Sequence, residues 1–398
     1  MFQRTLAPHL VTAAGQFPAV YLTGPRQSGK TTLARTCFPG FRYLSLEDLQ
    51  NRAEATQDPR GFLRQLEGLP GVILDEAQHT PDLFSYIQGF VDEKRSGPLI
   101  LTGSQNFLLS AKISQSLAGR TAVMELLPFS IAELTRRTAL TPADFEGGGM
   151  PTGGMPRLAV DTIIHAGFFP PIQDREIAPA TWLDSYVRTY VERDLRQLSA
   201  VGNLETFTRF LGLCAGRAGQ LLNASALGAE AGVDHATVRR WISFLQAGYV
   251  IDLLRPHFVN YSKRLVKTPK LYFQDTGVLC YLLGIRKPGD LQTHPLRGAI
   301  FENFVVNELR KLYIHQGQRP PLYFWRETGG REVDVVIDLG GKQLPIEIKS
   351  GLTVAPDAFR ELDRYAKLSD GPGGMLVHGG DATYVTQGRQ VRAWWMCS

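Results

Sequence analysis

A glycine-bounded loop between an apolar run and a helical stretch constrains this chain more than any other feature. Residues 24–31 read Gly-Pro-Arg-Gln-Ser-Gly-Lys-Thr and match the pattern G-x-x-x-x-G-K-[ST] without a mismatch. The apolar residues 19–23 precede the loop, and a helical stretch over residues 30–36 follows it. Glycine lets the backbone turn its N–H groups toward phosphate oxygens, and a helix N-terminus adds positive potential. The sequence therefore predicts a site for the phosphates of a nucleotide.

Two residues of this loop have distinct chemical roles. Lys30 supplies a positive charge for the β- and γ-phosphates of ATP, and the Thr31 hydroxyl is a ligand for the accompanying Mg²⁺. The residues expected to contact ATP are Gly24, Pro25, Arg26, Gln27, Ser28, Gly29, Lys30, Thr31 and Thr32.

Polar side chains follow two further apolar strands. Asp75 is placed to hold Mg²⁺ through water, and Glu76 is placed to polarise the attacking water as a general base. The next strand ends in Ser104, which we expect to sense the γ-phosphate, with Gln105 and Asn106 as alternatives. Small polar clusters also mark solvent-facing turns, so a simple turn is the other interpretation of this third strand end.

Short apolar runs alternate with helical stretches at the start of the chain. The runs are residues 19–23, 42–46, 71–75, 99–103 and 122–126. Strands that alternate with helices predict an α/β fold with a parallel sheet. The 398 residues are 43% hydrophobic and 20% charged, which suffices for several cores. No run of about 18 apolar residues predicts a membrane span, and no signal-peptide pattern is present, so we expect a cytoplasmic protein.

Together these motifs resemble the AAA+ class of ATPases, and the whole chain resembles a prokaryotic AAA-type family with a C-terminal domain of uncharacterised function. The likeness rests on the phosphate loop and on residues 74–76, 102–104, 117–120, 127–130, 167–170 and 186–194. The resemblance implies a homo-oligomeric ring, for which a hexamer is expected, in which an arginine of one subunit completes the site of the next. Arg120 matches that arginine, and a plain surface arginine is the alternative.

The pattern of residues along the chain predicts four domains, of which the last comprises residues 277–398. Residues 1–145 are expected to form the AAA+ P-loop ATPase core, and a glycine-rich connector over residues 146–154 follows it. Helical patterns over residues 155–216 predict a helical lid. Residues 217–275, with two helices joined at Gly232 and then a strand, predict a winged helix-turn-helix.

The predicted winged unit carries most of the net charge. Between Val233 and Asp275 there are seven Lys or Arg residues against three acids, a net +4 of the chain's +5, which indicates an anionic partner. The second helix buries a stripe at positions 238, 242 and 245, and two arginines lie off that stripe. The residues expected to bind DNA are Arg239, Arg240, Lys263, Arg264, Lys267 and Lys270. A lid with a solvated basic face, or a protein-interaction module, is the alternative.

Two alternating strands in residues 277–398 carry a further set of charged residues. Glu347 and Lys349 share one face of their strand because side chains repeat every two residues, and Asp334 lies on the strand before it. Two carboxylates can hold a divalent metal, and a lysine can orient water beside it. The pattern resembles the PD-(D/E)xK restriction-endonuclease-like fold, in which an early helix glutamate, here Glu302, joins the site. A hairpin with an exposed salt-bridged face is the alternative.

The expected function is ATP-driven remodelling of DNA or translocation on it. A winged helix after an AAA+ core resembles the branch-migration motors of Holliday junctions, so branched DNA is a candidate substrate. The alternative function is an ATP-dependent switch that assembles with a protein partner and whose nuclease-like domain is inert.

Overall fold

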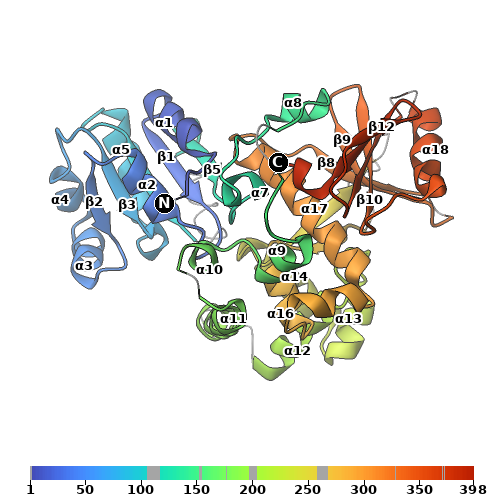
Figure 1. Cartoon of the computed structure of the whole chain (residues 1–398). Coiled ribbons are helices and arrows are strands. Elements are labelled where there is room, and N and C mark those ends of the chain that lie inside the picture. The colour runs from blue at the N-terminus through green and yellow to red at the C-terminus, as the bar shows by residue number, and fades with distance from the viewer. Residues whose placement is uncertain are drawn as a thin grey trace. The chain divides into compact units, whose positions relative to one another are not determined.

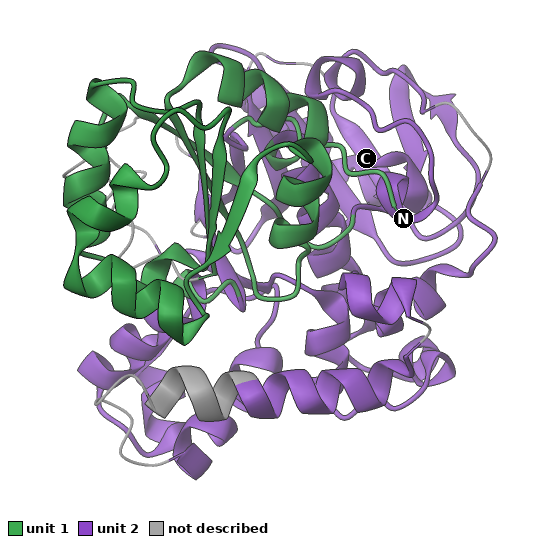
Figure 2. Ribbon diagram, turned by 90° about the vertical axis from the view of Figure 1, so that its left-hand side faces the viewer, with its two compact units in different colours: residues 1–129, 247–249, 314–318 green, residues 130–246, 250–313, 319–398 purple. Residues whose placement is uncertain are grey.

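The computed structural model describes most of the chain in two compact units (Figure 2). The described residues are 2–104, 117–151, 155–175, 177–196, 204–257, 268–327, 329–369, 371 and 373–398. Unit 1 comprises residues 1–129, 247–249 and 314–318, and unit 2 comprises residues 130–246, 250–313 and 319–398. Two short later segments therefore belong to the unit that contains the phosphate loop.

Unit 1 is a five-stranded sheet with helices on both faces (Figure 1). Its strands are β1 (Ala19–Thr23), β2 (Arg42–Ser45), β3 (Val72–Asp75), β4 (Leu99–Gly103) and β5 (Thr121–Glu125). Its helices are α1 (Ala7–Gln16), α2 (Lys30–Cys37), α3 (Leu49–Gln57), α4 (Pro59–Arg64), the 3-10 helix η1 (Ala77–His79) and α5 (Leu83–Asp92). All strand pairs are parallel, in the order β2-β3-β4-β1-β5. The predicted parallel α/β sheet is confirmed.

The central strand β1 is buried on both faces. Ala19 and Tyr21 pack in one hydrophobic cluster with α3, α4 and α5, whereas Val20 and Leu22 pack in another with α1 and α2. This division follows from the alternation of side chains along a strand. Because these strands are parallel, the carboxyl ends of β1, β3 and β4 lie at the same edge of the sheet, where polar residues follow each strand.

Unit 2 contains a series of helices and a second sheet. Its helices are α7 (Ile131–Leu134), α8 (Pro142–Glu146), α9 (Val160–Ala166), α10 (Pro170–Asp174), α11 (Pro179–Arg196), α12 (Leu204–Ala215), α13 (Ala224–Ala231), α14 (His235–Ala247), α16 (Thr276–Leu282), α17 (Arg297–Ile314) and α18 (Arg360–Ser369). The 3-10 helices are η2 (Pro288–Thr293), η3 (Pro356–Phe359) and η4 (Trp394–Met396). The strands are β6 (Ile251–Pro256), β7 (Lys270–Phe273), β8 (Leu322–Arg326), β9 (Glu332–Asp338), β10 (Gln343–Lys349), β11 (Met375–His378), β12 (Tyr384–Thr386) and β13 (Arg389–Ala393).

The sheet of unit 2 extends further than the sequence indicates. Its order is β12-β13-β11-β10-β9-β8-β6-β7. The strand expected within residues 217–275, β6, therefore lies near one end of the C-terminal sheet, next to β7, which was not predicted. β6 and β7 pair antiparallel, and β6 also pairs with β8 in parallel through Arg255 and Pro256. The structure thus differs from the expected separation at residues 275–277, because β8 supplies hydrogen-bond partners to an edge that β6 would otherwise leave open.

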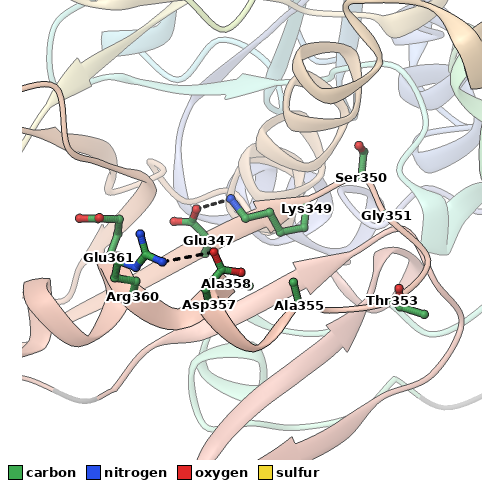
Figure 3. Close-up of a pocket in the computed structure, with 10 residues that line it drawn as sticks. All are labelled: Glu347, Lys349, Ser350, Gly351, Thr353, Ala355, Asp357, Ala358, Arg360 and Glu361. Atoms are coloured by element: carbon green, nitrogen blue, oxygen red, sulfur yellow. Dashed lines mark hydrogen bonds and ion pairs between the residues drawn. The ribbon is translucent and has the colours of Figure 1, made fainter.

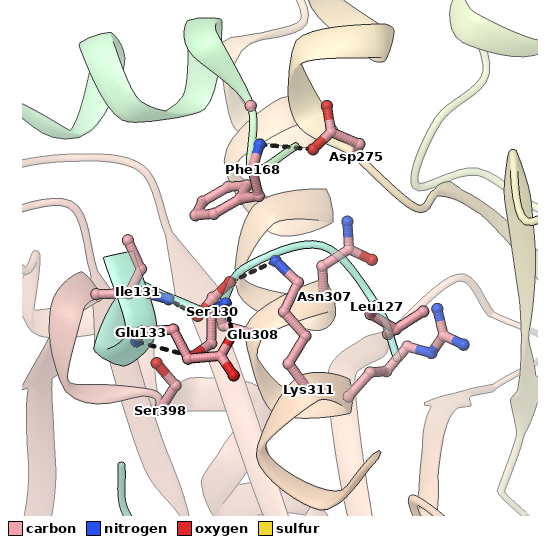
Figure 4. A network of polar contacts seen from close by, with 12 residues as sticks. Leu127, Ser130, Ile131, Glu133, Phe168, Asp275, Asn307, Glu308, Lys311 and Ser398 are labelled. Carbon is pink, nitrogen blue, oxygen red and sulfur yellow. Dashed lines mark hydrogen bonds and ion pairs between the residues drawn. The ribbon is translucent and has the colours of Figure 1, made fainter. Parts of the chain in front are cut away.

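Helix α17 connects distant segments of unit 2 through buried polar contacts (Figure 4). The Glu308 carboxylate accepts hydrogen bonds from the backbone N of Ile131 at 2.7 Å and from the Lys311 ammonium at 2.8 Å. The Asn307 amide donates to the Phe273 carbonyl at 2.8 Å. Buried polar groups are costly unless paired, so these contacts favour one arrangement of α7, β7 and α17.

The segment that begins at Gly167 docks on the same helix. The Phe168 backbone N donates to the Asp275 carboxylate at 2.7 Å, and the Phe168 ring stacks on Phe304 with centroids 5.9 Å apart. Gly167 has φ 73°, and a Cβ there would lie 2.3 Å from the same carboxylate, so a side chain is excluded. These residues, which carry part of the family resemblance, have a structural role.

Helices α12, α13 and α14 form a small cluster, and the turn between α13 and α14 lies at Gly232 as the sequence predicts. Gly232 ends α13 with φ 76°, and the side chains of Asn223 and Asp234 cap the starts of the two helices. Inside the cluster, the ring centroids of Phe207 and Trp241 lie 5.1 Å apart.

Across the parts of the chain that the structure describes, no helix combines the length and apolarity needed to span a bilayer.

Candidate functional site

The phosphate loop is held in shape by two glycines and by an arginine from the start of the chain. Gly24 has φ 144°, and a Cβ there would lie 2.2 Å from the Leu126 carbonyl oxygen, while Gly29 begins α2 with φ 94°. The Arg4 guanidinium donates to the carbonyls of Ser28 at 2.8 Å and of Leu127 at 2.6 Å. These contacts fix the loop at the carboxyl end of β1.

Lys30 is the cation of this loop. Its side chain is 5% exposed, and its ammonium donates to the carbonyls of Gly24 at 3.1 Å and Pro25 at 2.8 Å. Burial lowers the pKa of Lys30 to about 8, although Glu76 and Asp75 oppose the shift. An anionic phosphate would stabilise the charged form of this lysine, so its position fits the predicted role.

Ser28 adds a second sign that the loop suits phosphate. Its hydroxyl oxygen is buried and has no hydrogen-bond partner among the residues that the structure describes. A buried polar atom without a partner is costly, and a phosphate oxygen would satisfy it.

Asp75 is the centre of the polar network beside the loop. Its carboxylate accepts hydrogen bonds from the Thr31 hydroxyl at 2.9 and 3.1 Å and from the Tyr43 hydroxyl at 2.8 Å. The Thr102 hydroxyl also donates to it. Hydroxyl and carboxylate oxygens are the ligands that Mg²⁺ prefers, and the two that the sequence predicted, Thr31 and Asp75, lie together.

Glu76 lies beyond the end of β3 in an unusual backbone conformation. Its φ is 55°, in the left-handed region that non-glycine residues seldom occupy. The Ser104 hydroxyl donates to its carboxylate at 3.2 Å, the Gln78 amide donates to it as well, and its own backbone N donates to Thr102 Oγ1 at 3.2 Å. The predicted general base and the predicted γ-phosphate sensor are therefore neighbours.

The other predicted residues of this region are not placed at the phosphate loop by the described structure. Gln105 and Asn106 lie outside the described residues. Arg120 forms a two-pronged ion pair with Asp92, at 2.5 and 2.9 Å, and its carbonyl accepts from the backbone N of Ala19. It therefore lies at the amino edge of the sheet, opposite the phosphate loop, and serves no phosphate of its own subunit.

Several contacts of the site have no signal in the local sequence. The Tyr249 hydroxyl lies 3.0 Å from Oγ1 of Thr23, the residue directly before the loop, and Arg4 donates to the Ser28 carbonyl within the loop. Tyr43 donates to Asp75, and its pKa rises to about 12 because of burial and this hydrogen bond. A threonine within an apolar strand is an indicator that could have identified Thr102.

Helix α14 presents the basic face that the sequence predicts. Val238, Ile242 and Leu245 are buried, whereas Arg239 and Arg240 are exposed. Arg239 also lines a pocket of about 530 Å³ beside the start of the helix. The two arginines are thus accessible to an anionic partner.

Three of the predicted DNA-binding residues, Lys263, Arg264 and Lys267, lie outside the described residues. Lys270 does not fit the predicted DNA-binding set, because it is 2% exposed and forms ion pairs with Glu302 and Glu332. A lysine in this position neutralises buried acids and is closed to a phosphate backbone.

The residues of the nuclease-like pattern lie on α17, β9 and β10 of unit 2. Glu347 and Lys349 lie at the end of β10 with the ammonium 2.6 Å from the carboxylate, and they line a pocket of about 390 Å³ (Figure 3). On the paired strand β9, the Asp334 carboxylate accepts from the Ile348 backbone N at 2.8 Å. Glu302 and Glu332 bring one oxygen each to within 4.8 Å of an Asp334 oxygen. Glu332 was not identified from the sequence.

Burial raises the pKa of two of these carboxylates, those of Asp334 and Glu347. It raises the pKa of Asp334 well above its ordinary value, with the negative charges of Glu302 and Glu347 acting in the same direction. It also raises the pKa of Glu347, against the effect of Lys349. Glu347 Oε2 is buried and lacks a hydrogen-bond partner within the described parts of the chain, which suits a cation ligand.

Comparisons with known proteins agree with the geometry of unit 1. Residues 16–135 match the AAA domain family, which makes this region an AAA-type P-loop ATPase domain. Residues 152–289 and 297–396 match two families described as Domain of unknown function (DUF8612) and Domain of unknown function (DUF4143).

Among solved structures, the Walker-type ATPase PABY2304 of Pyrococcus abyssi is 15% identical with a TM-score of 0.47, over 71% of this chain and 96% of that protein. The RuvB Holliday junction branch migration motor of Thermotoga maritima is 18% identical with a TM-score of 0.32, over 63% of this chain and 89% of that protein.

Two curated relatives are similar over most of the chain. The uncharacterized proteins Mb2031c of Mycobacterium bovis and Rv2008c of Mycobacterium tuberculosis are each 34% identical over 365 residues, which cover 90% of this chain and 76% of theirs. With its AAA domain, the chain belongs to the family that includes these two mycobacterial proteins.

Proposed function

We propose that this chain hydrolyses ATP and uses the energy to remodel DNA. The proposal of ATP hydrolysis rests on one observation. Four residues lie together at the carboxyl edge of one parallel sheet, namely Lys30, Thr31, Asp75 and Glu76. Each residue brings a different part of phosphoryl transfer, and the AAA domain match supports ATP turnover in general.

The geometry supports a division of roles. The loop backbone and Lys30 would hold the β- and γ-phosphates, and Thr31 would bind Mg²⁺ directly with Asp75 behind it. Bound Mg²⁺ neutralises charge on the phosphates. Glu76 would accept a proton from the attacking water, and Ser104, which donates to Glu76 at 3.2 Å, would keep that carboxylate oriented.

The DNA half of the proposal rests on α14. Its exposed face carries Arg239 and Arg240, and the helix belongs to a compact cluster of three helices with a tight turn at Gly232. Such a pair on one helix can contact successive phosphates. The excess of basic over acidic residues from 233 to 275 supports the same partner.

The test is the rate of ATP hydrolysis against a panel of single-stranded, duplex, forked and four-way DNA. We expect at least one of these forms to accelerate turnover several-fold. If none does, and a protein from the same cell does, the chain is better described as an assembly switch.

A second candidate function, assigned to unit 2, is metal-dependent cleavage of the phosphodiester bonds of DNA. The specific observation is the buried Glu347 oxygen without a partner, beside Asp334 and the Lys349 ammonium. Asp334 and Glu347 would hold a divalent ion, which would supply Lewis acidity, and Lys349 would hold the attacked phosphate or a water.

A cleavage assay with Mn²⁺ on linear, forked and four-way DNA tests this candidate. Asp334→Ala should abolish cutting while ATP hydrolysis persists. Cutting that survives Asp334→Ala would place the active site elsewhere, and no cutting by the wild type would leave the domain as a DNA clamp.

A further inference from the structure

A lysine is buried among the carboxylates of unit 2. The Lys270 side chain is 2% exposed, and its ammonium lies 2.9 Å from Glu302 Oε1 and forms a second ion pair with Glu332. The Tyr272 hydroxyl donates to the same Glu302 oxygen at 2.6 Å. The Phe324 ring, whose centroid is 5.7 Å from the ammonium, forms an apolar wall.

The carboxylates around this ammonium are spaced like the ligands of a metal. One oxygen each of Glu302, Glu332 and Asp334 lie within 4.8 Å of one another. Oxygens that bind Mg²⁺, Mn²⁺ or Ca²⁺ at about 2.0–2.6 Å from the ion lie at comparable distances from one another. The spacing follows from the fold. Glu332 and Asp334 are two residues apart on β9 and therefore share one face of the strand, and Glu302 reaches them from α17.

A fourth carboxylate shows that the cluster lacks positive charge on one side. Glu347, from β10, is 6% exposed, and its Oε2 has no hydrogen-bond partner in the described structure. The cations that pair with the four acids are Lys270, Lys349 and Arg326, whose guanidinium lies 3.0 Å from the second Glu332 oxygen. Lys270 and Arg326 pair with Glu302 and Glu332, and Lys349 pairs with one oxygen of Glu347. The carboxylate oxygen that remains without a partner is therefore on the Asp334–Glu347 side.

We infer that the Lys270 ammonium is a resident cation, which takes the position of a divalent metal between Glu302 and Glu332. These two carboxylates are thereby closed to metal, and a divalent ion from solution is confined to the Asp334–Glu347 side of the cluster. Lys270 thus sets the number of metal ions that the carboxylate cluster accepts. The inference concerns metal binding and holds whether or not the domain cleaves DNA.

The substitution Lys270→Met tests this role because it removes the charge and keeps the length and apolar stem of the side chain. Without metal, the variant should unfold at a lower temperature, because buried carboxylates repel one another once their cation is lost. Added Mn²⁺ should restore the unfolding temperature, since an ion that binds only the folded state stabilises it.

The direct measurement is the number of Mn²⁺ ions bound by the nucleotide-free full chain, counted by electron paramagnetic resonance. Lys270→Met should bind one Mn²⁺ more than the wild type, and Lys270→Met with Glu302→Gln and Glu332→Gln should lose that ion. Arg326→Met is the matched control, because Arg326 pairs with the other Glu332 oxygen at 3.0 Å and leaves Lys270 in place. It should bind the wild-type number.

Equal Mn²⁺ counts in the wild type and Lys270→Met would overturn the inference, as would a wild-type count that falls with Glu302→Gln. If Lys270→Met does not fold, the triple variant decides. Recovery of folding by the triple variant supports charge compensation, and failure to fold means that Lys270 acts through packing alone. Loss of a wild-type ion in Asp334→Asn reports separately on the candidate nuclease site.

Discussion

Burial changes the pKa of Lys30, the lysine of the phosphate loop. Its ammonium lies under the loop against two backbone carbonyls, and burial lowers its pKa to about 8 despite the opposing charges of Glu76 and Asp75. A bound phosphate would favour the charged lysine and raise that pKa. Binding should therefore take up a proton wherever the free lysine is neutral.

This linkage predicts that ATP affinity falls as the pH rises above about 8, by up to about tenfold per pH unit, because each unit removes protonated Lys30 from the free protein. The dissociation constant of a fluorescent ATP analogue between pH 7 and 9.5 measures the effect. Lys30→Ala is the control, and it should bind weakly at every pH. A wild-type affinity that stays level across this range would contradict the assigned role of Lys30.

Glu76→Gln should keep ATP affinity near the wild-type value and slow turnover by roughly 100-fold or more, because an amide cannot accept the proton of the attacking water. The amide oxygen can still accept the hydrogen bond from Ser104, so the local geometry should persist. Phosphate release under single-turnover conditions measures the step. Turnover at the wild-type rate would remove Glu76 from the role of general base.

Residues with a local pattern were predictable from the sequence, and residues with distant partners were not. Lys30 and Asp75 stand in short motifs, and the structure brings them together as expected. Arg4 reaches a carbonyl 123 positions away, which no local pattern records. Lys270 lies in a basic stretch that predicts DNA binding. Its ion-pair partners Glu302 and Glu332 are far along the chain, so no local pattern shows that Lys270 is buried between them.

At the scale of elements, α14 carries the proposal of DNA binding. Arg239→Ala with Arg240→Ala should weaken DNA binding and reduce the slope of log K against log salt by up to about 1.8, because each lost phosphate contact releases about 0.9 fewer counterions. Binding isotherms at several salt concentrations measure the slope.

The control is Arg286→Ala with Lys287→Ala, an exposed basic pair outside α14 whose loss changes the net charge equally. It should leave the slope near the wild-type value. Equal slopes for the wild type and the α14 variant would favour a lid or a protein-interaction surface for this helix.

Periodicity predicted most elements, but it did not predict how the strands are shared. Asp334 and Glu347 were expected on two neighbouring strands and lie on β9 and β10, and Glu302 was expected on a helix and lies on α17. The sequence also predicts β6, but its partner β8 lies beyond α17, and strand pairing over such a distance leaves no trace in local alternation. The strand that the sequence assigned to the predicted winged unit, β6, is therefore part of the C-terminal sheet.

At the scale of the whole molecule, the position of Arg120 predicts that subunits complete one another's ATP sites. Arg120 and its partner Asp92 lie at the amino edge of the sheet, while the phosphate loop lies at the carboxyl edge. An arginine there can serve a phosphate of a neighbouring subunit, which is the role that the resemblance to AAA+ ATPases implies.

Arg120→Ala should lose most ATP hydrolysis, and so should Glu76→Gln. A mixture of the two variants should regain activity above either alone, because some interfaces then join an intact Arg120 to an intact Glu76. The rate of the mixture against the two pure variants is the measurement. No gain on mixing would mean that Arg120 does not act across subunits.

The central claim, that ATP hydrolysis drives work on DNA, is tested most directly by following the strands of a fluorescently labelled four-way or forked DNA. With ATP, the wild type should separate or migrate the strands, whereas Glu76→Gln should bind both ATP and DNA and leave the strands in place. The claim would be contradicted if the wild type hydrolysed ATP at one rate with and without every DNA form and moved no strand.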